Sequence, residues 1–517
     1  MIKVKVIKRD GRVVDYDKNK IKIAIEKANK EVPKKLMATK EDINSVIEYI
    51  EELDRKRILV EDIQDIIEEK LMELGKYQLA KKYIVYRYTR ALVRKSNTTD
   101  KSILGLIRES NKDLGEESSR PGIIASMQRD LIAGEVSKDL AKRILLPDKI
   151  TKAWEDGILH FHNADYFVQP VINSCFVKIG DMLDNGTVIN NKLIESPKSF
   201  YVACIVMSQI IGAVASNQYG EQYIDLMHLG KYLNKSKNKF EKEIKEEIGE
   251  NIDKNILQKL IEKRVKSELE SGVQTIFYQI NTFVTTNGRE PKVTLILHND
   301  ENNEYYQENL MIIEEIKRQR DLGIKNEKGE YEVSQIPKII SFEEMQKLHE
   351  GEFNQGIVSI NLPQIAIIAD GNEEEFWKLL DERLELCKEA LMCRYYALVG
   401  TLSDISPIHW QYGAIARLKK GEKIDELLYS DNSNITLTYV GTCQMSKLMK
   451  EETERNNFEN KVIQHMEDKI SKWRKETKIG FVLDGNFQEC ICRRFSKIDR
   501  EKFGTIEEIT DSNYCNK

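Results

Sequence analysis

The stretch from Ile336 to Ala366 constrains the fold more than any other part of the chain. Its second half, GIVSINLPQIA, is apolar, mixes small with β-branched residues, and ends its apolar run at a proline. Such a run predicts a buried strand that stops at Pro363, with Asn354 and Asn361 near its two ends. A buried amide without hydrogen-bond partners costs about 1–3 kcal/mol. Each of these amides is therefore either a satisfied structural group or a group directed at a ligand.

The chain is long and apolar enough to bury a large core. It has 517 residues, 41% of them hydrophobic, which predicts more than one domain. Its 80 basic and 85 acidic residues give a net charge of -5, which favours neither nucleic acid nor an anionic membrane as a partner. The N-terminal MIKVKVIKRD does not resemble a secretion signal, and no apolar run reaches the roughly 20 residues that span a bilayer. We therefore expect a cytoplasmic protein.

The eight cysteines do not form the pairs that a metal site or a disulfide framework needs. None belongs to a Cys-x-x-Cys motif, so the sequence predicts no structural zinc site. Long cytoplasmic chains also seldom carry disulfides. Most of the thiols are expected to be small buried apolar groups. The Cys-Ile-Cys triplet at 490–492 is interpreted as two thiols that alternate along a strand.

Residues 1–95 are predicted to form a small module with a β-hairpin and a helical bundle. VKVIKRDGRVVDYD alternates apolar and charged residues around Asp10-Gly11, a dipeptide typical of hairpin turns. Helical periodicity follows in KIKIAIEKANKEV, in EDINSVIEYIEEL and in VEDIQDIIEEKLMELGKYQLAKKYIVYRYTRAL.

Basic side chains crowd the hairpin and the start of the first helix. They are Lys5, Lys8, Arg9, Arg12, Lys18 and Lys20. One interpretation is a solvated charged edge that resists aggregation. The other is a polyphosphate-binding site, since cations and helix N-terminal amides both favour phosphate.

The polar SNTTD at 96–100 marks the predicted boundary with a second domain, residues 96–517. Helical segments alternate there with short apolar runs, which predicts a mixed α/β fold. A Lys- and Glu-rich segment near 231–271 is predicted to be one solvated, salt-bridged helix. His160 and His162, two residues apart, are expected to face the same side, as either core residues or ligands.

Two parts of the sequence resemble known families. VIKRDGRVVDYDKNKIKIAI and YIVYRYTR resemble the ATP-cone, the allosteric nucleotide domain of ribonucleotide reductases. GILHFHNADYFVQPVINSCFVKIGDMLDNGTVI, SFYVACIVMSQIIGAVASNQYGEQ and GEFNQGIVSINLPQIAI resemble the anaerobic, class III ribonucleoside-triphosphate reductases. Shorter similar stretches continue as far as RRFSKIDREKFG, so the second resemblance covers most of the chain after the first module.

The resemblance implies a fold and a chemistry. The fold class would be α/β, with an ATP-cone followed by the ten-stranded α/β barrel of ribonucleotide reductases and glycyl radical enzymes. In that family a glycyl radical oxidises a cysteine inside the barrel, and the thiyl radical then takes the 3′-hydrogen of the substrate. A radical-SAM iron–sulfur enzyme installs the glycyl radical, and formate is the electron donor in many members. The implied partners are nucleoside triphosphates, such an activating enzyme and a second copy of the chain.

Carried over position by position, the resemblance implies two sets of site residues. The candidate catalytic residues are Cys175, Asn361 and His162. The candidate effector site for ATP or dATP comprises Lys8, Arg9, Gly11, Arg12, Lys18 and Lys20. The match to the ATP-cone favours the polyphosphate interpretation of the basic hairpin.

The sequence departs from the family at its redox positions. Family members have several dozen residues, including the radical cysteine, between strands that resemble PKII and FNQG. Here Ile340 leads to Gly351 through SFEEMQKLHE, which contains no cysteine. Ser174 stands where a second cysteine is usual, and Cys175 is expected to face the other side of its strand. Asn163 replaces the aspartate that follows the two histidines in the family.

The chain ends at TDSNYCNK, where the family continues into its last strands, a four-cysteine zinc site and the glycyl radical loop. We therefore expect an incomplete barrel without that zinc. A serine hydroxyl cannot replace the thiol, because its O–H bond is much stronger than an S–H bond. Two functions stay open. The chain is either a reductase large chain that cannot catalyse alone and needs a complementing C-terminal fragment, or an inactive ATP/dATP-binding paralogue or gene fragment that regulates or pairs with an intact reductase.

Overall fold

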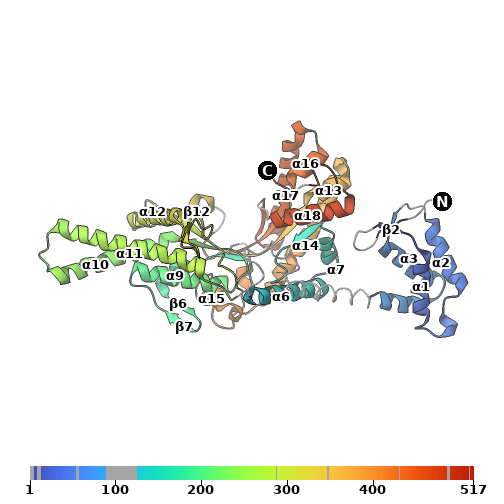
Figure 1. Cartoon of the computed structure of the whole chain (residues 1–517), viewed down its shortest axis with the longest axis horizontal. Helices are drawn as coiled ribbons and strands as arrows, with labels where there is room; N and C mark the ends of the chain where they lie inside the picture. Colours follow the sequence, from blue (N-terminus) through green and yellow to red (C-terminus); the bar gives the residue numbers. More distant parts are fainter. Residues whose placement is uncertain are drawn as a thin grey trace. The chain divides into compact units, whose positions relative to one another are not determined.

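The computed structural model describes residues 5–7, 13–53, 57–88, 125–286, 288–345, 349–429, 431–485, 489–511 and 513–516. The chain divides into two compact units, residues 1–105 with 500–504 and residues 106–499 with 505–517. Figure 1 shows the helices and strands of both units, coloured along the chain, and labels many of them.

The first unit is a three-stranded sheet covered by helices. Its elements are β1 (Lys5–Ile7), β2 (Val13–Asp15), β3 (Arg57–Leu59), α1 (Lys18–Asn29), α2 (Lys40–Glu52) and α3 (Val60–Glu73). β1 pairs antiparallel with β2 and parallel with β3. Asp17 caps the N-terminus of α1, and Thr39 with Asp42 forms a capping box at α2. The helices bury apolar residues such as Ile25 and Leu71 in one core with the strands.

The predicted hairpin and helical bundle are confirmed in the described residues, with one correction. β1 and β2 form the hairpin, whose turn at Asp10-Gly11 lies outside the described residues. The third helical segment is two helices, because α3 ends just before Gly75, whose φ of 72° is a conformation that favours glycine. The chain is helical again over residues 77–88.

A mixed sheet forms the centre of the second unit. Its strands are β4 (Leu159–Phe161), β5 (Ser174–Phe176), β8 (Gln222–Asp225), β9 (Val293–Leu297), β12 (Lys338–Ser341), β13 (Phe353–Asn361), β14 (Ser433–Val440) and β15 (Phe481–Asp484). The order is β12-β9-β8-β5-β13-β14-β15, and β4 pairs antiparallel with β13 beside β5. The four strands from β12 to β5 run parallel to one another, as do the three from β13 to β15. The two sets meet antiparallel at β5 and β13, so β13 joins them.

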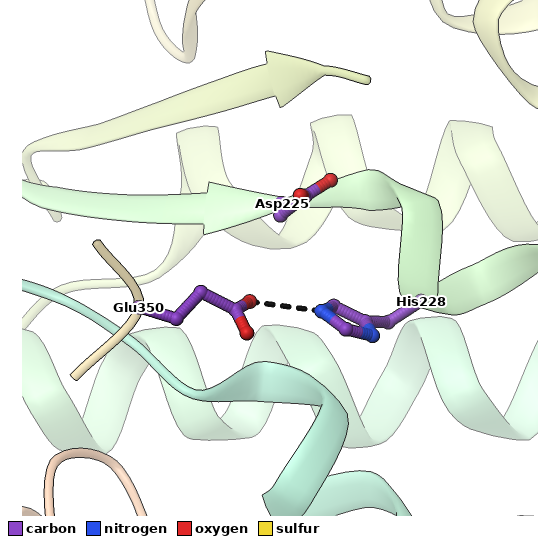
Figure 2. Close-up of side chains that lie close together, drawn as sticks. All are labelled: Asp225, His228 and Glu350. Atoms are coloured by element: carbon purple, nitrogen blue, oxygen red, sulfur yellow. Dashed lines mark hydrogen bonds and ion pairs between the residues drawn. The ribbon is translucent and has the colours of Figure 1, made fainter. Parts of the chain in front are cut away.

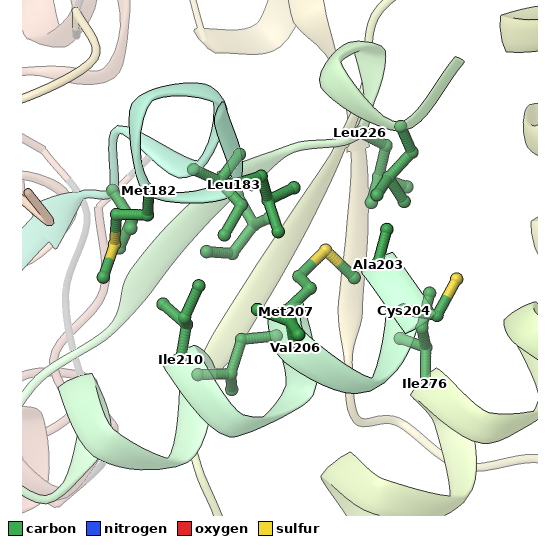
Figure 3. Packing of buried hydrophobic residues seen from close by; sticks show 14 of the residues in the cluster. Met182, Leu183, Ala203, Cys204, Val206, Met207, Ile210, Leu226 and Ile276 are labelled. Atoms are coloured by element: carbon green, nitrogen blue, oxygen red, sulfur yellow. The ribbon is translucent and has the colours of Figure 1, made fainter. Parts of the chain in front are cut away.

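Helices pack beside the first set of strands. They are α8 (Ile179–Asn185), α9 (Phe200–Ala215), α10 (Gly230–Ile248), α11 (Lys254–Thr282) and α12 (Tyr306–Leu322). In Figure 3 the α9 side chains Val206, Met207 and Ile210 lie in one apolar core with Met182 of α8 and Ile276 of α11. α10 and α11 run side by side as a long helical pair (Figure 1).

A second apolar core lies beside β13, β14 and β15. The surrounding helices are α7 (Asp148–Glu155), α13 (Leu362–Ala369), α14 (Glu373–Leu398), α16 (Thr442–Met449) and α17 (Arg455–Thr477). Val358 and Ile360 of β13 and Leu437 of β14 are buried there with Leu391 of α14 and Met466 of α17.

Further elements complete the described part of this unit. They include α6 (Ala125–Leu140), α15 (Pro407–Trp410), α18 (Glu489–Phe503) as far as Asp499, the ribbon of β6 (Thr187–Ile189) with β7 (Lys192–Ile194), the ribbon of β10 (Ile324–Lys325) with β11 (Tyr331–Glu332), and the short helices η3 (Leu226–Leu229) and η4 (Phe342–Met345).

The mixed α/β fold and the buried strand ending before Pro363 are confirmed, whereas two predictions are wrong. The segment near 231–271 is two helices, because Gly249, with a φ of 110°, ends α10 and Asp253 caps α11. The triplet at 490–492 lies in α18 rather than in a strand, since its buried residues recur at helical spacing. In the described residues no helix is both long and apolar enough to cross a bilayer.

Candidate functional site

β13 presents three of its polar side chains on the side of the sheet away from the second apolar core. Val358 and Ile360 enter that core, so Ser359 and Asn361, which alternate with them, lie on the opposite side. Asn354, seven residues before Asn361, would lie on the core side if the strand were regular. A β-bulge just after Asn354 inserts one residue relative to β14 and returns it to the polar side. The bulge therefore collects both amides on one face.

We call this side of the sheet the polar face. Strand register places on it Ser174 and Asn434 opposite Asn354, and Thr438 opposite Ser359. Nδ2 of Asn354 donates to Oδ1 of Asn434 at 2.5 Å and to Oγ1 of Thr436 at 2.8 Å. Oδ1 of Asn354 accepts a hydrogen bond from Nδ2 of Asn173, which lies just before β5, at 2.9 Å. Asn354 is thus a satisfied structural amide.

A second hydrogen-bonded group on the polar face contains His162. Its Nε2 lies 2.6 Å from Oγ of Ser359, which lies 2.5 Å from Oγ1 of Thr438. The ring of His160 packs edge-on at 4.7 Å, so the two histidines face the same side as predicted. Burial lowers the pKa of His162 to about 3, and the positive charges of two nearby arginines add to this shift. Burial also lowers the pKa of His160 well below its usual value. Both rings are therefore neutral at physiological pH.

Asn361 belongs to a buried network at the end of β13. Its Nδ2 donates to the carbonyl oxygen of Gly157 at 2.9 Å and to Oδ2 of Asp499 at 2.8 Å. Its Oδ1 caps α13 by accepting from the backbone N–H of Gln364 at 3.4 Å. Asp499, fully buried, also accepts from Nε2 of Gln364 at 2.6 Å and from the hydroxyl of Tyr514 at 2.9 Å. The amide of Asn361 is therefore engaged within the protein.

Cys175 faces away from the polar face. Strand register places it opposite Phe353 and Gln222, in the apolar core that contains α9, whereas Ser174 lies opposite Asn354. This is the alternation that the sequence predicts. Burial raises the pKa of Cys175 well above its usual value, so the thiol is neutral.

A small buried network holds this thiol in place. The thiol of Cys175 donates to Oε1 of Gln218 at 3.1 Å, and Nε2 of His409 lies 3.1 Å from the same oxygen. The other ring nitrogen of His409 lies 2.6 Å from Oγ of Ser406. Burial lowers the pKa of His409 to about 3.

None of the other seven cysteines lies on a strand of the sheet. They are Cys204 on α9, Cys387 and Cys393 on α14, Cys443 on α16, Cys490 and Cys492 on α18, and Cys515 beside Gln444. All eight are within the described residues, and Cys492 belongs to the same apolar cluster as Val440, the β14 residue opposite Asn361, so α18 places this thiol near the end of the polar face.

The three predicted catalytic residues are not gathered at one point. Along β13, Cys175 pairs with Phe353, the backbone N–H of His162 donates to Ile357, and Asn361 ends the strand. At a rise of about 3.3 Å per residue, the path from Phe353 to Asn361 spans roughly 26 Å. Their catalytic assignment stays a prediction.

A cavity of about 470 Å³ opens next to Gln218. Its wall includes Asp130, Asp165 and Tyr166. This volume is in the range of small-molecule pockets, about 300–1,000 Å³. Cys175 is not part of the wall, but its thiol bonds to Gln218, which is.

Part of the predicted polyphosphate site lies outside the described residues, namely Lys8, Arg9, Gly11 and Arg12. Lys18 and Lys20 are exposed in the first turn of α1. A helix N-terminus that carries two exposed lysines suits an anionic ligand.

A group of acidic and histidine side chains in the second unit was not predicted from the sequence. Donor atoms of Asp225, His228 and Glu350 all lie within 4.8 Å of one another (Figure 2). The spacing Asp-x-x-His was the only sequence signal. Glu350 lies 122 residues from His228, so only the fold brings it there.

The unfolding free energy of the second unit is expected to fall as pH drops from 7.5 to 5.5. Native His160, His162 and His409 have lowered pKa values, whereas an unfolded histidine titrates near 6.5. Below that pH the unfolded chain binds protons that the native state excludes, so each ring costs about 1 kcal/mol of stability between pH 6.5 and 5.5. His228 acts in the opposite direction: burial lowers its pKa, but the bond to Glu350 raises it overall.

Urea unfolding followed by tryptophan fluorescence measures this loss, because all four tryptophans lie in the second unit. His409→Gln should reduce the loss between pH 6.5 and 5.5 by about 1 kcal/mol. An identical pH dependence in the variant would contradict the assignment of a lowered pKa to His409.

Comparison with known families gives two matches. The family model described as anaerobic ribonucleoside-triphosphate reductase matches residues 117–343 and 334–517, and the ATP cone domain matches residues 4–92.

Relatives of this chain match over nearly its whole length. The anaerobic ribonucleoside-triphosphate reductase of Haemophilus influenzae is 30% identical over 572 aligned positions, covering 98% of this chain and 80% of the relative. The protein of the same name from Escherichia coli is 29% identical with the same coverage. The solved anaerobic ribonucleotide reductase of Thermotoga maritima in complex with dATP and CTP has a TM-score of 0.57, with 13% identity, and the match covers 81% of this chain and 80% of that one. At this identity the structural likeness concerns the fold alone.

Proposed function

Because the chain belongs to the anaerobic ribonucleoside-triphosphate reductase family, we propose that it binds nucleoside triphosphates but does not reduce ribonucleotides by itself. The position of the cysteines carries this proposal. By resemblance, the reaction begins when a cysteine radical takes the 3′-hydrogen of the ribose. Ser174 stands on the polar face where a thiol is usual, and none of the residues that the strands direct to that face is a cysteine.

The connection between β12 and β13 supports the loss of the radical cysteine. β12 ends at Ser341 and β13 begins at Phe353, and the residues between them include no cysteine. The two stretches of this chain that match the family model overlap at residues 334–343. The alignment with the Haemophilus influenzae relative has 572 positions, whereas this chain has 517 residues. The difference means that at least 55 residues of the relative have no counterpart in this chain. We infer that the cysteine loop is among them.

The contacts of the three candidate residues support the following proposed roles. We assign positioning roles on the polar face to His162 and Asn361, since both are held by hydrogen bonds within the protein. Cys175 is the remaining candidate for a redox role. Its direction toward the apolar core argues against that role. The proposed barrel is supported by two parallel strand sets that join antiparallel at β5 and β13.

The N-terminal unit is proposed to bind ATP or dATP as effectors. The family match to the ATP cone domain and the exposed Lys18 and Lys20 on the first turn of α1 support this. The proposed contacts to the phosphates come from Lys8, Arg9, Gly11, Arg12, Lys18 and Lys20. The solved Thermotoga maritima relative is itself described in complex with dATP.

Calorimetric titration of the full chain with dATP and with ATP tests the effector site. Replacing Arg9 and Arg12 together by alanine is expected to weaken binding at least about tenfold, because each charge-assisted hydrogen bond contributes about 1.5–3 kcal/mol. The control is Lys34→Ala with Lys35→Ala, which removes the same charge from the short exposed helix at 34–36. An absence of binding, or an equal loss in the control, would count against the effector site.

The same lack of a thiol favours a second candidate function, a paralogue that regulates or pairs with an intact reductase. The partners proposed by resemblance are a radical-SAM activating enzyme, a second copy of the chain and a complementing fragment. Adding the chain to an intact family member separates the two candidates. A regulator changes the dATP response of that enzyme, whereas a chain that only lacks a fragment leaves it unchanged.

A further inference from the structure

Four side chains meet where β8 and β9 end and where the connection from β12 returns to the sheet. Asp225 is the last residue of β8, His228 lies on η3, His298 follows β9, and Glu350 lies just before β13. In Figure 2, Glu350 and His228 point toward each other from separate segments, and Asp225 lies above them at the end of its strand. None of these groups has a part in the function proposed above.

The donor atoms are close to the spacing that a metal ion requires. Oε1 of Glu350 lies 2.9 Å from Nε2 of His228, and the donor atom of Asp225 lies within 4.8 Å of the other two. Bonds of about 2.0–2.2 Å to a first-row divalent ion put neighbouring donors roughly 3–3.5 Å apart. Small side-chain rotations would therefore close the set around an ion.

Asp225 is already oriented by its own partners. It is buried, it accepts from the backbone N–H of Met227 at 2.8 Å, and its Oδ2 lies 2.7 Å from Nδ1 of His298. The ring of His298 stacks on Phe342 at 3.6 Å. Hydrogen bonds of this kind hold metal ligands in a fixed orientation.

The surroundings supply negative charge for a cation and hold the ring of His228 in place. A Cβ on Gly180 would lie 2.5 Å from Nδ1 of His228, so this ring packs closely against the glycine. Within the part of the chain that the structure describes, Asp225 and Glu350 form ion pairs with histidines and with neither lysine nor arginine. Glu350 is partly exposed, but a buried carboxylate such as that of Asp225 needs a compensating charge. A divalent ion would supply it.

We propose that Asp225, His228 and Glu350 bind one divalent transition-metal ion and that His298 orients Asp225. A set of imidazole and carboxylate donors suits Zn²⁺, Fe²⁺, Co²⁺ or Mn²⁺, whereas Ca²⁺ and Mg²⁺ prefer oxygen donors alone. The bound ion ties η3 to the connection between β12 and β13. It thereby holds this connection against the end of the sheet.

Titration of the full chain with Co²⁺, followed by calorimetry and absorption, tests the site. Co²⁺ bound to thiolate absorbs strongly in the near ultraviolet, whereas Co²⁺ bound to imidazole and carboxylate does not, so binding to the free cysteines is recognised. The variants are His228→Gln and Glu350→Gln. The matched control is His465→Gln. Nε2 of His465 lies 2.7 Å from Oδ1 of Asp381, so it also forms a pair between a histidine and a carboxylate. Lys469 already pairs with the same oxygen at 3.0 Å, so we expect no metal ion there.

We expect the wild-type chain to bind one equivalent without thiolate absorption. Affinity should fall at least about tenfold in His228→Gln and in Glu350→Gln, and stay unchanged in His465→Gln. Saturating Co²⁺ should also raise the melting temperature of the wild type but not that of Glu350→Gln. Since Glu350 is partly exposed on a connection, this variant decides the result even if His228→Gln fails to fold. No binding, thiolate absorption alone, or an affinity in Glu350→Gln equal to that of the wild type would overturn the proposal, whatever the outcome for nucleotides.

Discussion

Incubated without oxygen with CTP, ATP, formate and a family activating enzyme, the chain is expected to form no dCTP. Abstraction of the 3′-hydrogen needs a thiyl radical, because an alcohol O–H bond is too strong for serine to take that role. Ser174 is the residue that faces the polar face on β5, and Cys175 faces the apolar core behind it. Neither packing nor a shifted pKa can replace a missing sulfur.

Chromatography of the nucleotides after the incubation measures this outcome. An intact reductase of the family, treated in the same way, is the positive control and should convert CTP. Formation of dCTP by this chain without a second polypeptide would contradict the proposal. It would also point to Cys175, whose thiol bonds to Gln218 in the wall of the cavity.

Replacing Asn361 by alanine is expected to lower the free energy of unfolding of the second unit by about 3 kcal/mol. The change removes the cap of α13, which contributes about 1 kcal/mol, and a buried hydrogen bond to the carboxyl group of Asp499, which contributes about 1.5–3 kcal/mol. It also leaves the carbonyl oxygen of Gly157 without that donor. The urea midpoint, followed by tryptophan fluorescence, measures the loss.

Asn372→Ala is the matched control for this substitution. Asn372 caps α14 by accepting from the backbone N–H of Glu375 at 3.2 Å, and it is exposed. Its replacement removes a helix cap without disturbing a buried network, so the expected cost is about 1 kcal/mol. Equal costs for the two substitutions would mean that the bond from Asn361 to Asp499 adds nothing to stability.

Short-range sequence patterns predicted the helices and strands of this fold better than they predicted which side of the sheet each side chain faces. The apolar run GIVSIN is buried as β13, as expected from its composition. The side of the sheet that Asn354 faces depends on the bulge that follows it. The only hint of this bulge in the sequence is Gly356, where a side chain would collide with Arg394. Pairing with β14 reveals the bulge, and this pairing is a long-range property. Cys175 was placed correctly because β5 keeps its alternation.

The errors came from patterns too short to distinguish a strand from a helix. Cys490 and Cys492 fit a period of two, but Ile491, Phe495 and Asp499 recur at a spacing of four and are buried in α18. The group around Asp225 could not be predicted at all, because the parts of the chain that build it are distant in sequence.

The release of tritium from [3′-³H]CTP tests the central claim most directly, because it reports hydrogen abstraction even where reduction does not follow. A thiyl radical that takes the labelled hydrogen forms a thiol, and the thiol exchanges its hydrogen with water. With the activating enzyme present, we expect this chain to release no more tritium than the same mixture without that enzyme. Release that grows with time and requires the activating enzyme would contradict the claim that no cysteine of this chain reaches the ribose.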